Sequence, residues 1–120
     1  MISEIPKLPD HVAGFMGTGY ITALDYESVL IPTVEDKLER HDKVNFLYHL
    51  PEEFCGFEAG ALWDDAKVGL THRSEWGKVA MVCDVPWMER AVKVAAFLIK
   101  GEVKLFSTDH YHDAVAWVSD

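Results

Sequence analysis

The chain has 120 residues, of which 49% are hydrophobic and 26% charged, and its formal net charge is −9. This length predicts a single domain, residues 1–120, because a second hydrophobic core would need a longer chain. The acidic charge repels phosphate groups, so we do not expect a nucleic-acid partner. No apolar run approaches the roughly 20 residues of a membrane helix, and the first residues lack a signal-peptide pattern. We therefore expect a cytoplasmic protein.

The hydrophobic pattern alternates between the period of a strand and the period of a helix along the chain. In chain order it predicts strands at 2–5 and 12–18, a helix at 22–41, a strand at 44–50, a helix at 58–71, a strand at 79–85, a helix at 86–99, a strand at 103–106 and a helix at 109–119. The first two strands are expected to pair as a hairpin. The later alternation predicts an α/β fold with a mainly parallel sheet, whose ligands bind near the carboxyl ends of the strands.

Helix boundaries are indicated by a few residues with special backbone chemistry. Thr22 is the expected N-cap of the first helix, with Asp25 in the capping-box position. Pro32 lies inside that helix and predicts a kink between residues 28 and 32. Asp84 is the expected cap of the helix at 86–99, and Gly101 follows the end of that helix.

The two cysteines carry no sign of catalysis. Cys55 could act as a nucleophile only with a base such as His49 and a lowered pKa, yet carboxylates surround it in the sequence. Cys83 lies in an apolar strand and is expected to be a core residue. We expect both to be free thiols in a reducing compartment, and we do not expect an enzyme.

Metal and phosphate sites are not indicated either. The segment Asp-His-Tyr-His-Asp at residues 109–113 offers two histidines, but at a helix start they point in different directions, and no second cluster matches it. The chain has neither GxGxxG nor GxxxxGK[ST], so no nucleotide loop is expected. Adjacent carboxylates at 52–53 and 64–65 do not share a helix face. No catalytic residue, metal or cofactor is therefore predicted.

The apolar surface of the helices is larger than contact with a sheet requires. Residues 85–99 are apolar over a wide arc, whereas covering one sheet face needs a stripe of about 100°. The excess indicates a pocket, a dimer partner or a lipid surface, unless the helix is simply well buried. Aromatic residues after two strands would meet at one end of the sheet, as an apolar ligand site requires. The expected lining is Phe54, Phe57, Leu62, Trp63, Trp87, Met88 and Val94.

Several segments along the whole chain resemble the bacterial SpoIIAA-like family, whose fold is of the STAS and CRAL-TRIO type. They are Ile-Pro-Lys-Leu-Pro at 5–9, Asp-Tyr-Glu-Ser-Val-Leu-Ile-Pro at 25–32, Phe-Glu-Ala-Gly-Ala-Leu-Trp-Asp-Asp-Ala-Lys-Val-Gly at 57–69, Val-Cys-Asp-Val-Pro-Trp at 82–87 and Ala-Val-Ala-Trp at 114–117. The resemblance implies an α/β sandwich with about five strands, one of them antiparallel at an edge. It also implies a homodimer, helices that open over an apolar cavity, a nonpolar or lipid-like ligand and peripheral membrane contact.

A second relative, the anti-sigma-factor antagonist, carries a phosphorylatable Ser in an Asp-Ser-Ser-Gly-like turn. The corresponding residues 52–60 contain no Ser or Thr, so that switch is not expected here. Gly56 and Gly60 flank Phe57 and could act as hinges for a mobile helix. The sequence thus predicts a non-enzymatic binding protein for a small nonpolar ligand, with a STAS-type protein-interaction module as the alternative.

Overall fold

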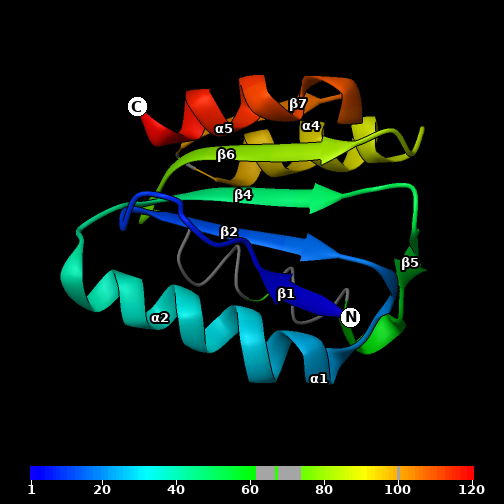
Figure 1. Ribbon diagram of the computed structural model, residues 1–120, viewed down its shortest axis with the longest axis horizontal. Coiled ribbons are helices and arrows are strands. Elements are labelled where there is room, and N and C mark those ends of the chain that lie inside the picture. Colours follow the sequence, from blue (N-terminus) through cyan, green and yellow to red (C-terminus); the bar gives the residue numbers. More distant parts are fainter. Residues whose placement is uncertain (62–66, 68–73, 100) are drawn as a thin grey trace.

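The computed structural model describes residues 1–61, 67, 74–99 and 101–120. Its centre is a five-stranded sheet in the order β1-β2-β4-β6-β7 (Figure 1). β1 pairs antiparallel with β2, and the other neighbours pair in parallel, which confirms the predicted fold class and the edge hairpin. The strand bounds are Ile2–Glu4 for β1, Val12–Gly17 for β2, Val44–Leu50 for β4, Trp76–Cys83 for β6 and Glu102–Phe106 for β7.

The central strands are apolar because both of their faces are covered. β4 has the sequence Val-Asn-Phe-Leu-Tyr-His-Leu, and all of its residues except His49 are buried. Successive side chains of a strand point to opposite faces, so Phe46 and Tyr48 belong to one core and Leu47 to the other. This double burial explains the continuous apolar runs that identified the strands in the sequence.

The larger core lies between the sheet and the helices of one face. Its helices are α1 (Ala23–Asp25), a π-helical turn (Tyr26–Leu30), α2 (Ile31–Arg40) and α4 (Met88–Leu98). Thr22 and Asp25 form the predicted capping box, since each side chain accepts from the other residue's backbone N–H. The expected irregularity before Pro32 takes the form of the π-helical turn, because proline has no N–H for an ordinary helical hydrogen bond.

A small second sheet was not predicted from the sequence. β3 (Gly19–Ile21) pairs in parallel with β5 (Phe54–Phe57). The prediction treated residues 54–57 as part of a connection, because four residues with an internal glycine give no readable alternation. Gly56 has φ of 150°, a value that side-chain-bearing residues rarely adopt. The helix predicted at 58–71 begins at residue 59, and most of it lies outside the described residues.

The prediction that Asp84 caps the helix after β6 is wrong. Asp84 does not cap α4, which follows Trp87 without a side-chain cap. Its carboxylate instead accepts from the backbone N–H and the hydroxyl of Thr108. Thr108 starts a 3₁₀ turn (Thr108–His110) that leads into α5 (Tyr111–Ser119). β6 and β7 are parallel neighbours, so their carboxyl ends lie side by side. Asp84, which follows β6, therefore bonds to Thr108, which follows β7, rather than to the helix that comes next in the chain.

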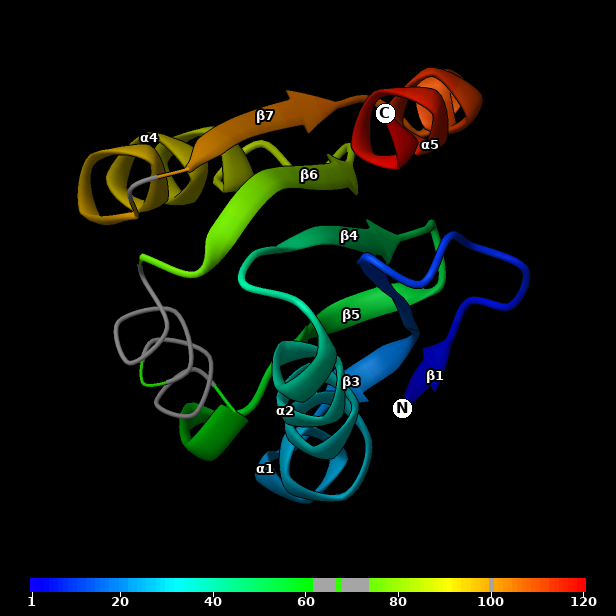
Figure 2. The same ribbon diagram turned by 90° about the vertical axis from the view of Figure 1, so that its left-hand side faces the viewer.

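The second core lies on the opposite face of the sheet, under α5 (Figure 2). Its buried members are Val12, Leu47, Ala80, Val82, Ala114 and Val118. Asn45 holds the end of α5 to this face. Its amide donates to the carbonyl of Val118 at 2.6 Å, and its carbonyl oxygen accepts from the N–H of Lys78 at 2.8 Å.

Replacing Asn45 with Ala should lower the free energy of unfolding by about 2 kcal/mol, because two backbone groups lose buried partners. Urea unfolding measures this difference. Lys78→Met is the control, since it removes a part-buried bond from the ammonium to the carbonyl of Trp117 and a cation–π contact with the Trp117 ring at 5.6 Å, and it should cost less than about 1 kcal/mol. Equal losses in both variants would show that Asn45 has no special part in holding α5.

Candidate ligand cavity between the sheet and α4

A cavity of about 160 Å³ lies between α4 and the sheet. α4 and α5 cover opposite faces of the sheet (Figure 2). Most of its described wall comes from β4, β6 and the edge strand β7, and from one side of α4. The lining residues are Leu30, Phe46, Tyr48, Phe57, Trp76, Val79, Met81, Trp87, Met88, Ala91, Val92, Ala95, Ile99 and Val103. None of these described lining residues carries a charge, so the cavity suits a nonpolar occupant.

Strand register accounts for the sheet wall of the cavity. Tyr48 of β4 pairs with Met81 of β6, and Val79 of β6 pairs with Val103 of β7. Because alternate residues share a face, these positions with Phe46 project toward α4. The strands therefore supply large side chains at regular intervals along one wall.

The helix wall includes small side chains at helical spacing. Its residues recur at intervals of three or four on α4 and just beyond it, namely Met88, Ala91, Ala95 and Ile99. Residues three and four apart lie on the same side of a helix. Alanine at two of these positions keeps the helix wall thin, which leaves space that larger side chains would fill.

Three of the seven predicted lining residues line this cavity, namely Phe57, Trp87 and Met88. Phe54 is buried behind them and packs its ring against Phe57 at a centroid distance of 5.1 Å. Val94 is not in the lining and is 59% exposed. It lies on the side of α4 away from the cavity. Because the apolar arc of this helix is wide, the sequence did not indicate which side faces the sheet. Leu62 and Trp63 lie outside the described residues.

Sequence reasoning did not select the strand residues of the cavity. Phe46, Tyr48, Val79 and Met81 alternate along buried strands, and this alternation was the available signal. The space beside such residues is normally filled by a covering helix, so the pattern alone does not separate a cavity wall from a closed core. Whether a cavity remains beside the strands depends on the size of the helix side chains that face them, and Ala91 and Ala95 of α4 are small.

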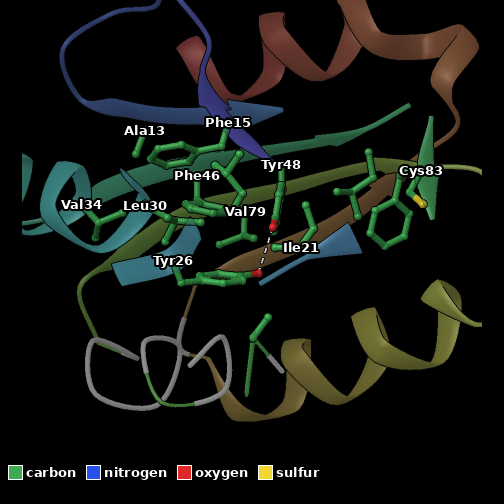
Figure 3. Close-up of a cluster of buried hydrophobic side chains, with 14 of the residues drawn as sticks. Ala13, Phe15, Ile21, Tyr26, Leu30, Val34, Phe46, Tyr48, Val79 and Cys83 are labelled. Carbon is green, nitrogen blue, oxygen red and sulfur yellow. Dashed lines mark hydrogen bonds between the residues drawn. The ribbon is translucent and has the colours of Figure 1, made fainter. Parts of the chain in front are cut away.

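Two tyrosines place a pair of hydroxyl groups within the larger core. Tyr26 of the π-helical turn and Tyr48 of β4 point toward one another, with 2.9 Å between their oxygens (Figure 3). Tyr26 is fully buried, and Tyr48 is 2% exposed. Only Tyr48 of the two lines the cavity.

The candidate catalytic residues lie elsewhere. Cys55 is exposed, and its thiol approaches the carbonyl of Glu53 at 3.7 Å. His49 is directed to the α5 face, where its ring packs against Tyr111 at 4.5 Å. Cys83 is a free thiol of the larger core, and burial raises its pKa, which makes the reactive thiolate scarcer. His49, the base considered for Cys55, is thus engaged on another face of the sheet.

His49 is expected to titrate below its ordinary pKa of 6.5. Burial lowers the pKa of this imidazole, and the nearby carboxylate of Glu53 offsets part of that effect. Because the folded state favours the neutral ring, the stability that His49 contributes is full above pH 6.5 and is lost as the pH falls through the lowered pKa. An NMR titration of the ring protons tests this, and Glu53→Gln should lower the pKa further. A His49 pKa above 6.5 would contradict the assignment.

The histidines of the segment 109–113 lie at the surface. His110 pairs with Asp113 at 3.0 Å. This contact is an ordinary exposed ion pair at the start of α5 when the histidine is protonated. In the part of the chain that the structure describes, no group of three or more His, Cys, Asp or Glu side chains is arranged to hold a metal ion.

The outer side of α4 exposes several large apolar side chains. The exposed fractions are 88% for Phe97, 59% for Val94, 47% for Trp87 and 42% for Leu98. Within the described residues no helix is both long enough and apolar enough to span a bilayer. We call Phe97, Val94 and Leu98 the outer patch of α4, since Trp87 precedes the helix and also lines the cavity.

Comparisons with known proteins agree with the fold. The family model described as SpoIIAA-like matches residues 12–119. A crystal structure of an uncharacterized protein of the DUF3478 family with a SpoIIAA-like fold, from Shewanella loihica PV-4, is 28% identical. The match covers 98% of this chain and 93% of that one, with a TM-score of 0.71. No curated protein gives a significant match. The chain belongs to the SpoIIAA-like family.

Proposed function

We propose that this protein is a non-enzymatic binding protein that holds a small nonpolar molecule between α4 and the sheet. The observation that carries the proposal is the cavity of about 160 Å³ with an uncharged, mainly hydrocarbon lining. A cavity of roughly 150 Å³ with a similar lining stays dry in another protein and binds benzene. The described lining contains no histidine, carboxylate or thiol that would act on such a molecule.

The size of the cavity limits the ligand. Sites for drug-sized molecules have volumes of about 300–1,000 Å³, well above the volume here. The space suits one aromatic ring or a short branched chain. A lipid-like ligand would place one segment of its hydrocarbon in this cavity and the remainder outside it.

The proposal is tested first on protein as purified and then with a defined probe. Native mass spectrometry and organic extraction would reveal a nonpolar molecule that remains bound through purification. Toluene is the probe, and at ten times its Kd it should stabilise the folded state by about 1.4 kcal/mol. This corresponds to a rise of a few degrees in Tm for a chain of this size. Protein that is purified empty and whose Tm ignores toluene would contradict the proposal.

A second candidate function rests on the outer patch of α4. The exposed apolar side chains Phe97, Val94 and Leu98 on one helix favour contact with a membrane interface, a partner protein or a second copy of the chain. Regulatory and protein-interaction roles are consistent with the SpoIIAA-like fold. We propose the membrane interface as the first occupant to test, with Arg90 on the same helix to meet lipid phosphates, whereas Lys93 pairs with Glu89 at 3.7 Å.

Liposome flotation combined with light scattering separates these occupants. Phe97→Asp should reduce flotation, while Leu24→Asp makes the same change at another exposed apolar side chain, on α1, and should have no effect. Dimerisation that Phe97→Asp abolishes would assign the outer patch to a second copy instead. A monomeric wild-type protein that does not float would contradict both uses of the patch.

A further inference from the structure

The strand β7 forms an open edge of the main sheet. It is the last strand in the order β1-β2-β4-β6-β7 and lies at the margin of the molecule (Figure 2). In the described part of the chain, no backbone hydrogen bond joins β7 to any element other than β6. The N–H and C=O groups on its outer side are therefore available to a further strand, as at other open sheet edges.

The features that usually protect an open edge are weak in β7. Such edges are often blocked by proline, by a bulge or by lysine. β7 has the sequence Glu-Val-Lys-Leu-Phe and pairs with β6 without a register shift, so it holds neither proline nor a bulge. The ammonium of Lys104 lies over the rings of Phe106 at 5.2 Å and Trp117 at 5.6 Å. These cation–π contacts hold the lysine against the α5 face of the sheet rather than across its edge.

The two charged residues of β7 complement the same strand in a second copy of the chain. Glu102 and Lys104 are exposed and two residues apart, so both project from the α5 face. Neither forms an ion pair with another described residue. When two β7 strands pair antiparallel with Val103 opposite Val103, each Glu102 lies opposite Lys104 of the other copy. A register centred on Lys104 or on Glu102 would place like charges opposite each other, which is unfavourable.

We propose that β7 binds β7 of a second copy of this chain, antiparallel and with Val103 opposite Val103, so that two five-stranded sheets become one continuous sheet. Every contact then occurs twice, because a twofold axis relates the copies, as in most soluble homodimers. The axis keeps α4 of both copies on one face of the joint sheet and α5 on the other. This surface is separate from the cavity and from the outer patch of α4, so the inference does not depend on a ligand.

The acidic charge of the chain does not prevent this pairing at physiological salt. Each copy has a formal net charge of −9, which opposes association at long range. Charges farther apart than about 8 Å are largely screened at 0.15 M salt. Side chains directly opposite each other on paired strands lie only about 5 Å apart, so their attraction is screened much less.

Reversing the two charges of β7, singly and together, tests the proposal. Analytical ultracentrifugation of the full chain at 0.15 M salt should show a dimer of the wild-type protein at tens of micromolar. Lys104→Glu places carboxylates opposite each other at two positions and should weaken dimerisation about tenfold. Glu102→Lys should do the same with ammonium groups, and it leaves the cation–π contacts of Lys104 in place. The double variant Glu102→Lys/Lys104→Glu restores opposite charges, so its Kd should return to within about threefold of the wild-type value.

Two controls separate this interface from other causes of association. Lys43→Glu makes the same change of net charge at an exposed lysine before β4, and it should alter the Kd by less than about twofold. Phe97→Asp changes the outer patch of α4 and should leave the dimer intact. The far-UV circular dichroism spectrum of each variant checks its fold, and Glu102→Lys carries the test if Lys104→Glu fails to fold.

Three results would overturn the inference. The first is a wild-type protein that stays monomeric at tens of micromolar. The second is a double variant as weakly associated as the single variants, because the charges of β7 would then not face each other across the interface. The third is a dimer that Phe97→Asp abolishes and that ignores both single reversals, since the copies would then meet through the outer patch of α4.

Discussion

Replacing Ala95 with Phe is expected to abolish toluene binding while leaving the protein folded. Ala95 lies in the helix wall of the cavity, opposite the strand residues, and its small side chain leaves room there. A phenyl ring is the size of molecule that such a cavity holds, so the new side chain would occupy the ligand's place. The toluene-induced rise in Tm should fall from a few degrees to less than about one degree.

The neighbouring alanine supplies a matched control. Ala96 is exposed on α4 and is not a lining residue. Ala96→Phe makes the same chemical change on the same helix, yet it should leave the response to toluene unchanged. Filling the cavity should alter the free energy of unfolding of Ala95→Phe by no more than about 1–3 kcal/mol. Loss of the response in both variants would indicate a general effect on α4 rather than occupation of the cavity.

Replacing Gly101 with Ala should lower the free energy of unfolding by about 3 kcal/mol, the upper part of the range for added atoms in a packed interior. Gly101 precedes β7 and lies against the backbone of β6 where that strand begins. A Cβ at this position would meet the carbonyl oxygen of Gly77 and would lie 2.7 Å from that of Trp76. Both obstacles are backbone atoms, so a side-chain rotation cannot relieve the clash and the backbone itself would have to shift.

Gly60→Ala is the control for this substitution. Among the described residues, a Cβ there would meet the Cβ of Ala23, at 3.2 Å. Residue 60 is helical, where Ala is favoured over Gly by up to about 1 kcal/mol. Urea unfolding of the two variants should therefore differ clearly. A Gly101→Ala protein as stable as the wild type would show that the close approach of the two strands is relaxed without cost.

The main sheet was predictable because its strands are buried on both sides. Continuous apolar runs such as residues 44–50 and 79–85 identify covered strands without knowledge of their neighbours. The capping box at Thr22 was equally readable, since both of its partners lie within one helical turn. β3 and β5 were not predicted, because strands of three and four residues are too short to show an alternating pattern and are recognised only by their pairing.

The cavity was harder to predict than the fold. The excess of apolar residues at 86–99 indicated a second contact for that helix, but it did not distinguish the inner side from the outer side. Val94 and Met88 both belong to the apolar arc, yet Val94 is 59% exposed and Met88 is 2% exposed. Which of these residues is buried depends on the side of α4 that packs against the sheet, and this is set by tertiary structure rather than by the local sequence. The tyrosine pair likewise joins residues 22 positions apart, which local patterns do not connect.

A crystal structure of the protein soaked with toluene would test the central claim most directly. We expect electron density for one toluene molecule between α4 and the sheet, in contact with Ala95 and Met81. The methyl and ring carbons should lie within about 4.0–4.5 Å of the surrounding side chains, as for other buried apolar contacts. An empty cavity at saturating toluene, or a row of ordered waters along that wall, would contradict the account.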